Sequence, residues 1–186
     1  MNISYMNDPN EGRMATRFIW GTDITNPSER QNVRVPYVFM KCFTSQIDYL
    51  PMWELYGDAA KGCCLVLDGR ETFADANVPL FRVCYIQQNA NGLTINSTCN
   101  HGFNYKSVKK HMMALKSIAK KMHGEEGKVY LGELIKPILY LFKDSSYHYE
   151  EEVRILYSFD KMCDEIRRTP GNKGLHGRII RIFTAE

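Results

Sequence analysis

Two glutamates and an arginine alternate in one short segment, Glu150-x-Glu152-x-Arg154. Residues 152–159 (EVRILYSF) predict a β-strand, in which alternate side chains point to one face, so we expect the three side chains about 7 Å apart at each step. Neighbouring carboxylates raise each other's pKa and an arginine lowers it, so such a site can hold a general acid or base beside a hydrogen-bonding carboxylate. Taken alone, the segment favours the other interpretation, a solvated strand face with an ion pair. Glu151 would lie on the opposite face, and we do not expect it in the site.

Hydroxyl and aromatic side chains stand at two earlier places in the chain. Thr44 and Ser45 end a strand predicted over 35–43, where hydroxyls either orient a ligand or cap the turn that follows. Capping is the favoured interpretation. Trp53 and Tyr56 lie three residues apart and share one face of a predicted helix. They belong either to the core, which is favoured, or to one wall of a cleft.

The segment 105–123 predicts the clearest helix, because its apolar residues recur at steps of three and four. Those residues are Val108, Met112, Leu115, Ala119 and Met122. Six lysines cover most of the remaining surface, namely Lys106, Lys109, Lys110, Lys116, Lys120 and Lys121. Lysines can contact phosphates, but a solvated face is favoured here, since the net charge is only +3 and no aromatic residues lie between the lysines.

Several classes of site receive no support from the sequence. The five histidines form neither an i, i+4 pair nor an HExxH motif, and the six cysteines contain no C-x-x-C pair, so we expect no metal. The motifs GxxxxGK[ST], GxGxxG and GxSxG are absent. No apolar stretch approaches the ~20 residues that span a membrane, so we expect no membrane partner. Cysteine usage predicts free, buried thiols in a reducing cytosol, and hence a cytoplasmic protein.

The elements that must position these residues mix helices and strands without regular alternation. Helices are expected over 13–20, from Asp48 as N-cap to Gly57, over 105–123 and over about 128–142, with a kink or break at Pro137. Strands are expected over 35–43, 62–68 (buried), 79–88 (half-buried), 93–95, 152–159 and 178–183. The 186 residues therefore predict one α+β domain, residues 1–186, in which helices flank a mixed or antiparallel sheet.

Four segments in this order and spacing resemble the bacterial "domain of unknown function 2971" family. The resemblance covers most of residues 5–158. The segments are Tyr5-Met6-Asn7-Asp8-Pro9-Asn10-Glu11-Gly12; Cys42-Phe43-Thr44-Ser45 with Asp48 and Met52-Trp53-Glu54-Leu55-Tyr56-Gly57; Lys61-Gly62-Cys63-Cys64-Leu65-Val66-Leu67-Asp68; and Lys143 with Tyr149-Glu150-Glu151-Glu152-Val153-Arg154-Ile155.

The layout is also similar, more loosely, to the ADP-ribosyltransferase superfamily. That similarity implies a split sheet and NAD⁺ as substrate, cleaved at its nicotinamide–ribose bond with transfer of ADP-ribose. It places Thr44 and Ser45 in the strand-end hydroxyl element, Glu150 at the first carboxylate position and Glu152 at the catalytic one. A fixed carboxylate there would stabilise the positive charge that develops on the ribose. The other substrate-binding residues that the resemblance implies are Trp53, Tyr56, Arg154, Asn7 and Asp8, with Trp53 or Tyr56 stacking on nicotinamide.

One departure from the family pattern concerns its His-Tyr-Thr-like strand, which precedes the Asn-Asp-Pro segment. Here Met1 stands only six residues before Asn7, so we expect that strand to be missing or to come from a partner chain. The resemblance thus implies an ADP-ribosyltransferase-like protein of the toxin, effector or phage-defence type, with a protein or nucleic acid as acceptor. A non-catalytic module that binds a nucleotide or a protein is the alternative, and a nucleic-acid binder acting through the lysine-rich helix is the third hypothesis.

Overall fold

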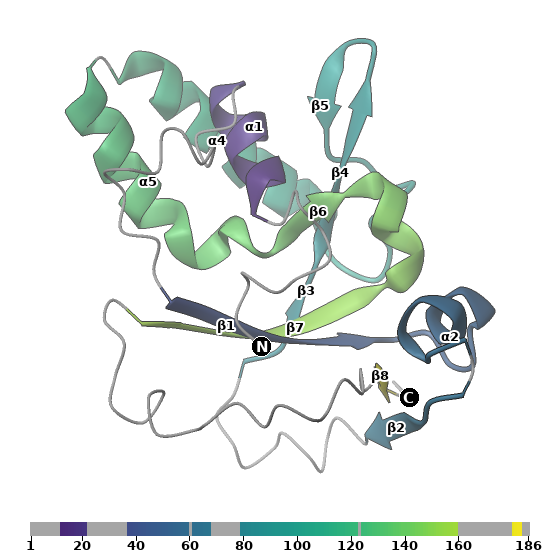
Figure 1. Ribbon diagram of the computed structural model, residues 1–186. Coiled ribbons are helices and arrows are strands. Elements are labelled where there is room, and N and C mark those ends of the chain that lie inside the picture. The colour runs from purple at the N-terminus through teal and green to yellow at the C-terminus, as the bar shows by residue number, and fades with distance from the viewer. Residues whose placement is uncertain are drawn as a thin grey trace. The chain divides into compact units, whose positions relative to one another are not determined.

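A computed structural model describes residues 12–21, 37–59, 61–67, 79–122, 124–159 and 180–183. The chain is organised in two compact units, and Figure 1 labels their elements. The first unit takes in residues 37–82 and the chain from Glu150 onward, and the second takes in residues 3–36 and 83–149. The predicted α+β class, with helices and a mixed sheet, is confirmed. That the two units make up a single domain stays a prediction.

A five-stranded mixed sheet forms the centre of the first unit, in the order β2-β8-β1-β7-β3. Its strands are β1 (Tyr37–Thr44), β2 (Cys64–Leu67), β3 (Phe81–Arg82), β7 (Glu152–Phe159) and β8 (Ile180–Phe183). β1 and β7 are antiparallel, whereas β8 runs parallel to β1 and β2. Thr44 lies opposite Glu152, and Cys42 lies opposite Arg154. Since directly opposed residues point to the same face, this register brings Thr44 and Glu152 together.

The other face of β1 and β7 is apolar around Phe43 and Ile155, whereas Lys41 on the same face is exposed. Phe43 and Ile155 are buried there, and Val153 and Leu67 pack against them. These residues alternate along their strands with Thr44, Glu152 and Arg154, which are also buried. Where β1 ends and β7 begins, the sheet is therefore buried on both faces, with apolar residues on one face and hydrogen-bonded polar residues on the other.

Two strand predictions for this part of the chain need correction. The run 62–68 does form a strand, β2, but Leu65 is 42% exposed and Val66 60% exposed, so β2 is not buried. β2 is the terminal strand of the sheet order, and the local apolar run carries no information about that position. The run 79–88 forms two strands and not one, because β3 pairs with β7 whereas β4 pairs in the other sheet.

Helix α2 (Leu50–Tyr56) follows β1 and has Pro51 in its first turn, where proline is tolerated. The N–H of Gly57 donates to the carbonyl oxygen of Trp53 and ends the helix as predicted. The prediction of Asp48 as N-cap is wrong. That position belongs to Tyr49, which makes no side-chain cap, while Asp48 has a φ of +49°. An N-cap residue typically has an extended backbone, as Tyr49 does and Asp48 does not.

The second unit contains a three-stranded sheet in the order β5-β4-β6. Its strands are β4 (Cys84–Asn89), β5 (Gly92–Thr94) and β6 (Phe142–Asp144). β4 and β5 form an antiparallel hairpin, and β4 and β6 are parallel. Four successive residues, 83–86, are buried. The prediction of a half-buried strand here is therefore wrong, because β4 begins with both faces covered.

The α-helices in the described part of this unit are α1 (Arg13–Trp20), α4 (Tyr105–Lys121) and α5 (Glu125–Leu139). α1 packs against α4, α5 and β6, with Met14, Phe18 and Ile19 buried. The predicted apolar stripe of α4 is confirmed at its centre, where Met112 and Ala119 are buried. The helix is not broken at Pro137, because α5 continues to Leu139, and the alternative of a kink there stays a prediction. A short 3₁₀-helix, η3 (Ser145–Glu150), links β6 to β7.

Candidate functional site

Glu152 and Arg154 form a bidentate ion pair at the start of β7. Arg154 Nε donates to Glu152 Oε1 at 2.9 Å, and Nη2 donates to Oε2 at 2.8 Å. The Arg154 side chain is 0% exposed and that of Glu152 is 6% exposed. The two residues share a strand face and form an ion pair, as predicted, but the prediction that this face is solvated is wrong. The planar fork of the guanidinium matches the carboxylate and fixes its orientation.

Glu150 does not lie on the strand, contrary to the prediction that it shares a strand face with Glu152 and Arg154. It is the last residue of η3, and Glu151 after it has a φ of +40°. The left-handed backbone at Glu151 turns the chain before β7 begins, so strand alternation does not relate Glu150 to Glu152. Glu150 is nevertheless buried, and its Oε1 accepts a hydrogen bond of 2.7 Å from the Tyr56 hydroxyl. The two carboxylates therefore have different partners, a phenol and a guanidinium.

Thr44 joins the end of β1 to the segment that carries both carboxylates. Its Oγ1 donates to the backbone oxygen of Glu150 at 2.6 Å and accepts from the amide of Gln46 at 3.0 Å. The second bond closes the turn after β1, as the capping interpretation predicted. The first bond was not predicted. Together they hold Thr44, which is 1% exposed and lies opposite Glu152, beside the two acidic residues.

Ser45 binds Glu151, the glutamate that the sequence analysis set aside. Its Oγ donates to Glu151 Oε2 at 2.7 Å, and its amide donates to the Glu151 backbone oxygen at 3.2 Å. The left-handed backbone removes Glu151 from the strand pattern and turns it toward Ser45. No local sequence signal predicts a positive φ at a glutamate, so this residue was missed.

Trp53 and Tyr56 are both half-buried, and their polar atoms bind different carboxylates. Trp53 Nε1 donates to Asp48 Oδ1 at 2.8 Å, while the Tyr56 hydroxyl donates to Glu150. Only Tyr56 is thus tied to the acidic segment. Asp48 acts as an acceptor for the indole and not as a helix cap, and the sequence analysis did not anticipate that role.

Asn7 and Asp8, the remaining predicted site residues, lie outside the described residues. Among the ranges that the structure does describe, no group of three or more His, Cys, Asp or Glu side chains is arranged to hold a metal ion. In the same ranges no helix is long and apolar enough to cross a membrane.

Cys84 and Cys64 offer little nucleophilic character. Burial raises the pKa of the Cys84 thiol from 9.0 to about 12. Burial also raises the pKa of the Cys64 thiol, and the nearby Cys63 and Asp48 add to the effect. A thiol with a raised pKa holds little of the reactive thiolate at neutral pH. All five cysteines of the described residues are free, but the predicted burial holds only for Cys84 and Cys99, since Cys42 and Cys64 are half-buried and Cys63 is exposed.

The site that these contacts define, called here the acidic junction, joins the end of β1, the end of α2 and the start of β7. Its members are Thr44, Ser45, Tyr56, Glu150, Glu151, Glu152 and Arg154. It combines oriented carboxylates with hydroxyl groups. Such a set can stabilise a developing positive charge and hydrogen-bond a polyol such as ribose.

Comparison with known proteins gives one family. No curated protein and no solved structure matches the chain at a significant level. The family described as "Protein of unknown function (DUF2971)" matches residues 52–155, which is more than half of the chain. The match includes the α2 residues from Met52 onward and the segment 150–154, and it confirms the family resemblance over residues 52–155. The chain therefore belongs to the DUF2971 family of proteins of unknown function.

Proposed function

We propose that this protein is an ADP-ribosyltransferase-like enzyme that uses NAD⁺ as its substrate at the acidic junction. One observation carries the proposal. Thr44 and Tyr56 both donate hydrogen bonds to Glu150, which lies about 100 positions further along the chain, at 2.6 and 2.7 Å. The register of β1 and β7 also places Thr44 opposite Glu152. A strand-end hydroxyl beside paired carboxylates is the arrangement that the looser resemblance implies for NAD⁺ cleavage.

The reaction breaks the bond between ribose C1′ and the nicotinamide nitrogen. The bonding electron pair leaves with nicotinamide, which becomes neutral, and positive charge develops on the ribose. An acceptor nucleophile then forms a new bond to C1′ and loses its proton. A carboxylate held near the ribose stabilises the charge only while it develops, so it lowers the barrier to bond cleavage.

The contacts of the acidic junction suggest separate tasks for the two carboxylates. Arg154 fixes the plane of the Glu152 carboxylate through two hydrogen bonds, one to each oxygen. We assign Glu152 to charge stabilisation on the ribose. Glu150, bound to the Tyr56 hydroxyl, would accept from a ribose hydroxyl or from the acceptor. Trp53 and Tyr56 would provide the aromatic surface for nicotinamide.

The direct test follows nicotinamide release from NAD⁺, together with transfer of label from NAD⁺ to protein or nucleic acid in a cell lysate. Glu152→Gln and Glu150→Gln are compared with Glu54→Gln, a matched change at an exposed residue of α2. Loss of one group that stabilises transition-state charge costs about 100- to 1,000-fold in rate, so we expect that loss in Glu152→Gln and none in Glu54→Gln. Circular dichroism establishes that each variant is folded. Absence of turnover by the wild type with every lysate, or equal turnover by Glu152→Gln, would refute the proposal.

A binding module without catalysis is the second candidate, and the ion pair itself favours it. Both Glu152 oxygens already accept from Arg154, and the side chain is nearly inaccessible. Such a module would bind NAD⁺ or ADP-ribose without releasing nicotinamide. At 100 times its dissociation constant, a ligand adds about 2.7 kcal/mol to the free energy of unfolding. A thermal shift with NAD⁺ but no nicotinamide release would therefore select this candidate.

A further inference from the structure

The charge of this protein is strongly segregated along the chain. Residues 83–124 contain six lysines and no aspartate or glutamate. The rest of the chain holds 18 lysines and arginines against 21 acidic residues, so it is net −3 while this segment is +6. The small net charge of +3 thus conceals a basic region within the second unit, and all six lysines lie on α4.

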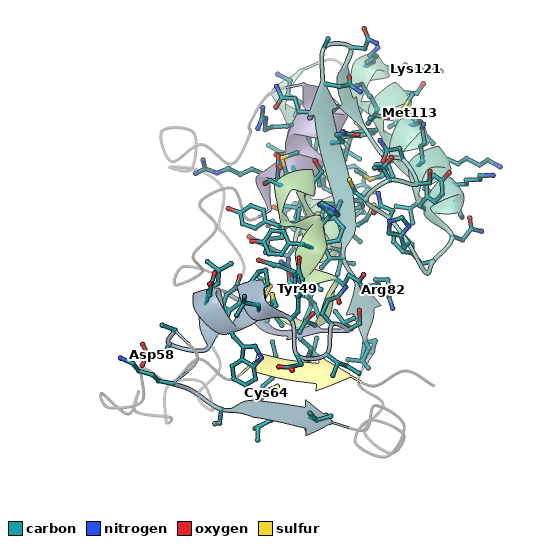
Figure 2. The ribbon with its side chains drawn as sticks, turned by 90° about the vertical axis from the view of Figure 1, so that its right-hand side faces the viewer. Tyr49, Asp58, Cys64, Arg82, Met113 and Lys121 are labelled. Atoms are coloured by element: carbon teal, nitrogen blue, oxygen red, sulfur yellow. The ribbon has the colours of Figure 1, made fainter. Side chains whose placement is uncertain are left out.

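Five of these lysines share one exposed surface of α4, called here the lysine face. Successive helical residues are about 100° apart, which places the five within an arc of about 120°. Their first and last members, Lys106 and Lys121, are separated by about 22 Å along the helix axis. The lysine face consists of Lys106, Lys109, Lys110, Lys120 and Lys121, all exposed. Met113, 51% exposed, lies in the same arc, and Figure 2 labels it with Lys121.

No acidic group of the described residues forms an ion pair with the lysine face. Lys116, the sixth lysine, differs because its ammonium lies 5.1 Å from the centroid of the Phe18 ring. On α5, Glu133 is paired with Lys136 of the same helix and not with the lysine face. The mutual repulsion of the five lysines is therefore not relieved within the described part of the chain, and an anionic partner would relieve it.

The distribution of apolar and basic residues on α4 favours binding to a nucleic-acid phosphate backbone over binding to a lipid surface. A helix that lies on a membrane inserts an apolar face carrying Trp, Phe or Leu. The apolar stripe of α4 is instead used inside the unit, where Met112 and Ala119 are buried, and the lysine face holds no aromatic residue. Contact with nucleic-acid phosphates needs only cations, spaced along a track.

We propose that the lysine face is a nucleic-acid-binding surface that contacts the phosphate backbone without reading sequence. Each lysine that neutralises a phosphate of duplex DNA contributes about −0.9 to the slope of log K against log salt concentration. Five contacts give a slope of about −4.5. Affinity would then fall by roughly 500-fold between 50 and 200 mM salt.

The test measures fluorescence anisotropy of labelled 20-nucleotide duplex DNA and RNA of two unrelated sequences, over a salt series. The double variant Lys109→Gln/Lys120→Gln is compared with Lys61→Gln/Arg82→Gln, which removes the same charge from exposed positions of the first unit. We expect the first variant to reduce the magnitude of the slope by about 1.8 and the control to leave the slope unchanged. Exposed substitutions of this kind change stability by less than about 0.5 kcal/mol, so both variants should remain folded.

Three results would overturn the proposal. They are no binding at 50 mM salt, equal weakening in the control variant, and binding to phosphatidylserine vesicles without binding to either nucleic acid. A strong preference for one of the two sequences would also contradict readout of the backbone alone. None of these measurements involves NAD⁺, so the outcome is independent of the function proposed for the acidic junction.

Discussion

Arg154 holds Glu152 through two parallel hydrogen bonds while its own side chain is completely shielded from solvent. The residues are two apart on one strand, so a single segment supplies both charges and aligns them. Removing one partner leaves the other charge buried, which costs far more than the pair itself contributes. The effect of a Glu152 substitution on catalysis must therefore be measured separately from its effect on stability.

We predict that Arg154→Met lowers the free energy of unfolding by about 3–5 kcal/mol, because the buried Glu152 carboxylate loses the guanidinium that bonds to both of its oxygens. The double variant Glu152→Leu/Arg154→Met should recover most of this loss, since apolar residues of similar volume can replace a buried ion pair. Urea unfolding measures both, with Glu54→Gln as the exposed control. A double variant as unstable as the single one would contradict this account.

Tyr56→Phe should lower the free energy of unfolding by about 1.5–3 kcal/mol, because a hydrogen bond to a charged acceptor is lost at the 2.7 Å contact with Glu150. Glu150→Gln keeps an acceptor for the phenol and should cost less. Urea unfolding of the two variants gives the comparison. Equal stability of Tyr56→Phe and the wild type would show that the bond contributes nothing in solution.

Thr44→Val keeps the volume of the side chain and removes both hydrogen bonds of its hydroxyl. We expect a loss of about 1–3 kcal/mol, since the backbone oxygen of Glu150 would lose this partner in a buried position. The amide of Gln46 should also exchange its hydrogen faster. Thr44→Ser keeps the hydroxyl and should preserve protection of that amide, which hydrogen exchange measured by NMR can follow. If the Gln46 amide hydrogen exchanges at the same rate in Thr44→Val as in the wild type, its bond to Thr44 does not stabilise the turn.

Stability should fall at alkaline pH partly because of Cys84. Burial raises the pKa of its thiol from 9.0 to about 12, so the unfolded chain releases this proton at a lower pH than the folded chain does. The contribution of Cys84 to stability is fully present below pH 9 and is lost as the pH rises toward 12. It amounts to at most about 4 kcal/mol, from three pKa units. Cys84→Ala should flatten the alkaline decline, whereas Cys63→Ala, at an exposed thiol, should not.

Local pattern predicted the elements that its residues can decide by themselves. The apolar periodicity of α4, the glycine that ends α2 and the run at the start of β7 each gave an element close to the observed one. The corrections to the strand predictions concern the neighbours of each strand in the sheet. β2 lies at a sheet edge, and β3 and β4 belong to different sheets, although each run is a reasonable strand. Strand patterns describe the two faces of one segment and do not identify its neighbours.

The sequence by itself determined the fold class, the family and the membership of most of the acidic junction, because strand and helix periods and the spacing of the family segments are local properties. The tertiary structure decided what each of those residues does. The β1–β7 register brought Thr44 opposite Glu152, a left-handed backbone at Glu151 moved Glu150 off the strand, and α2 delivered the Tyr56 hydroxyl to Glu150. Each of these depends on long-range pairing or on an unusual backbone angle, for which the local residues carry no signal.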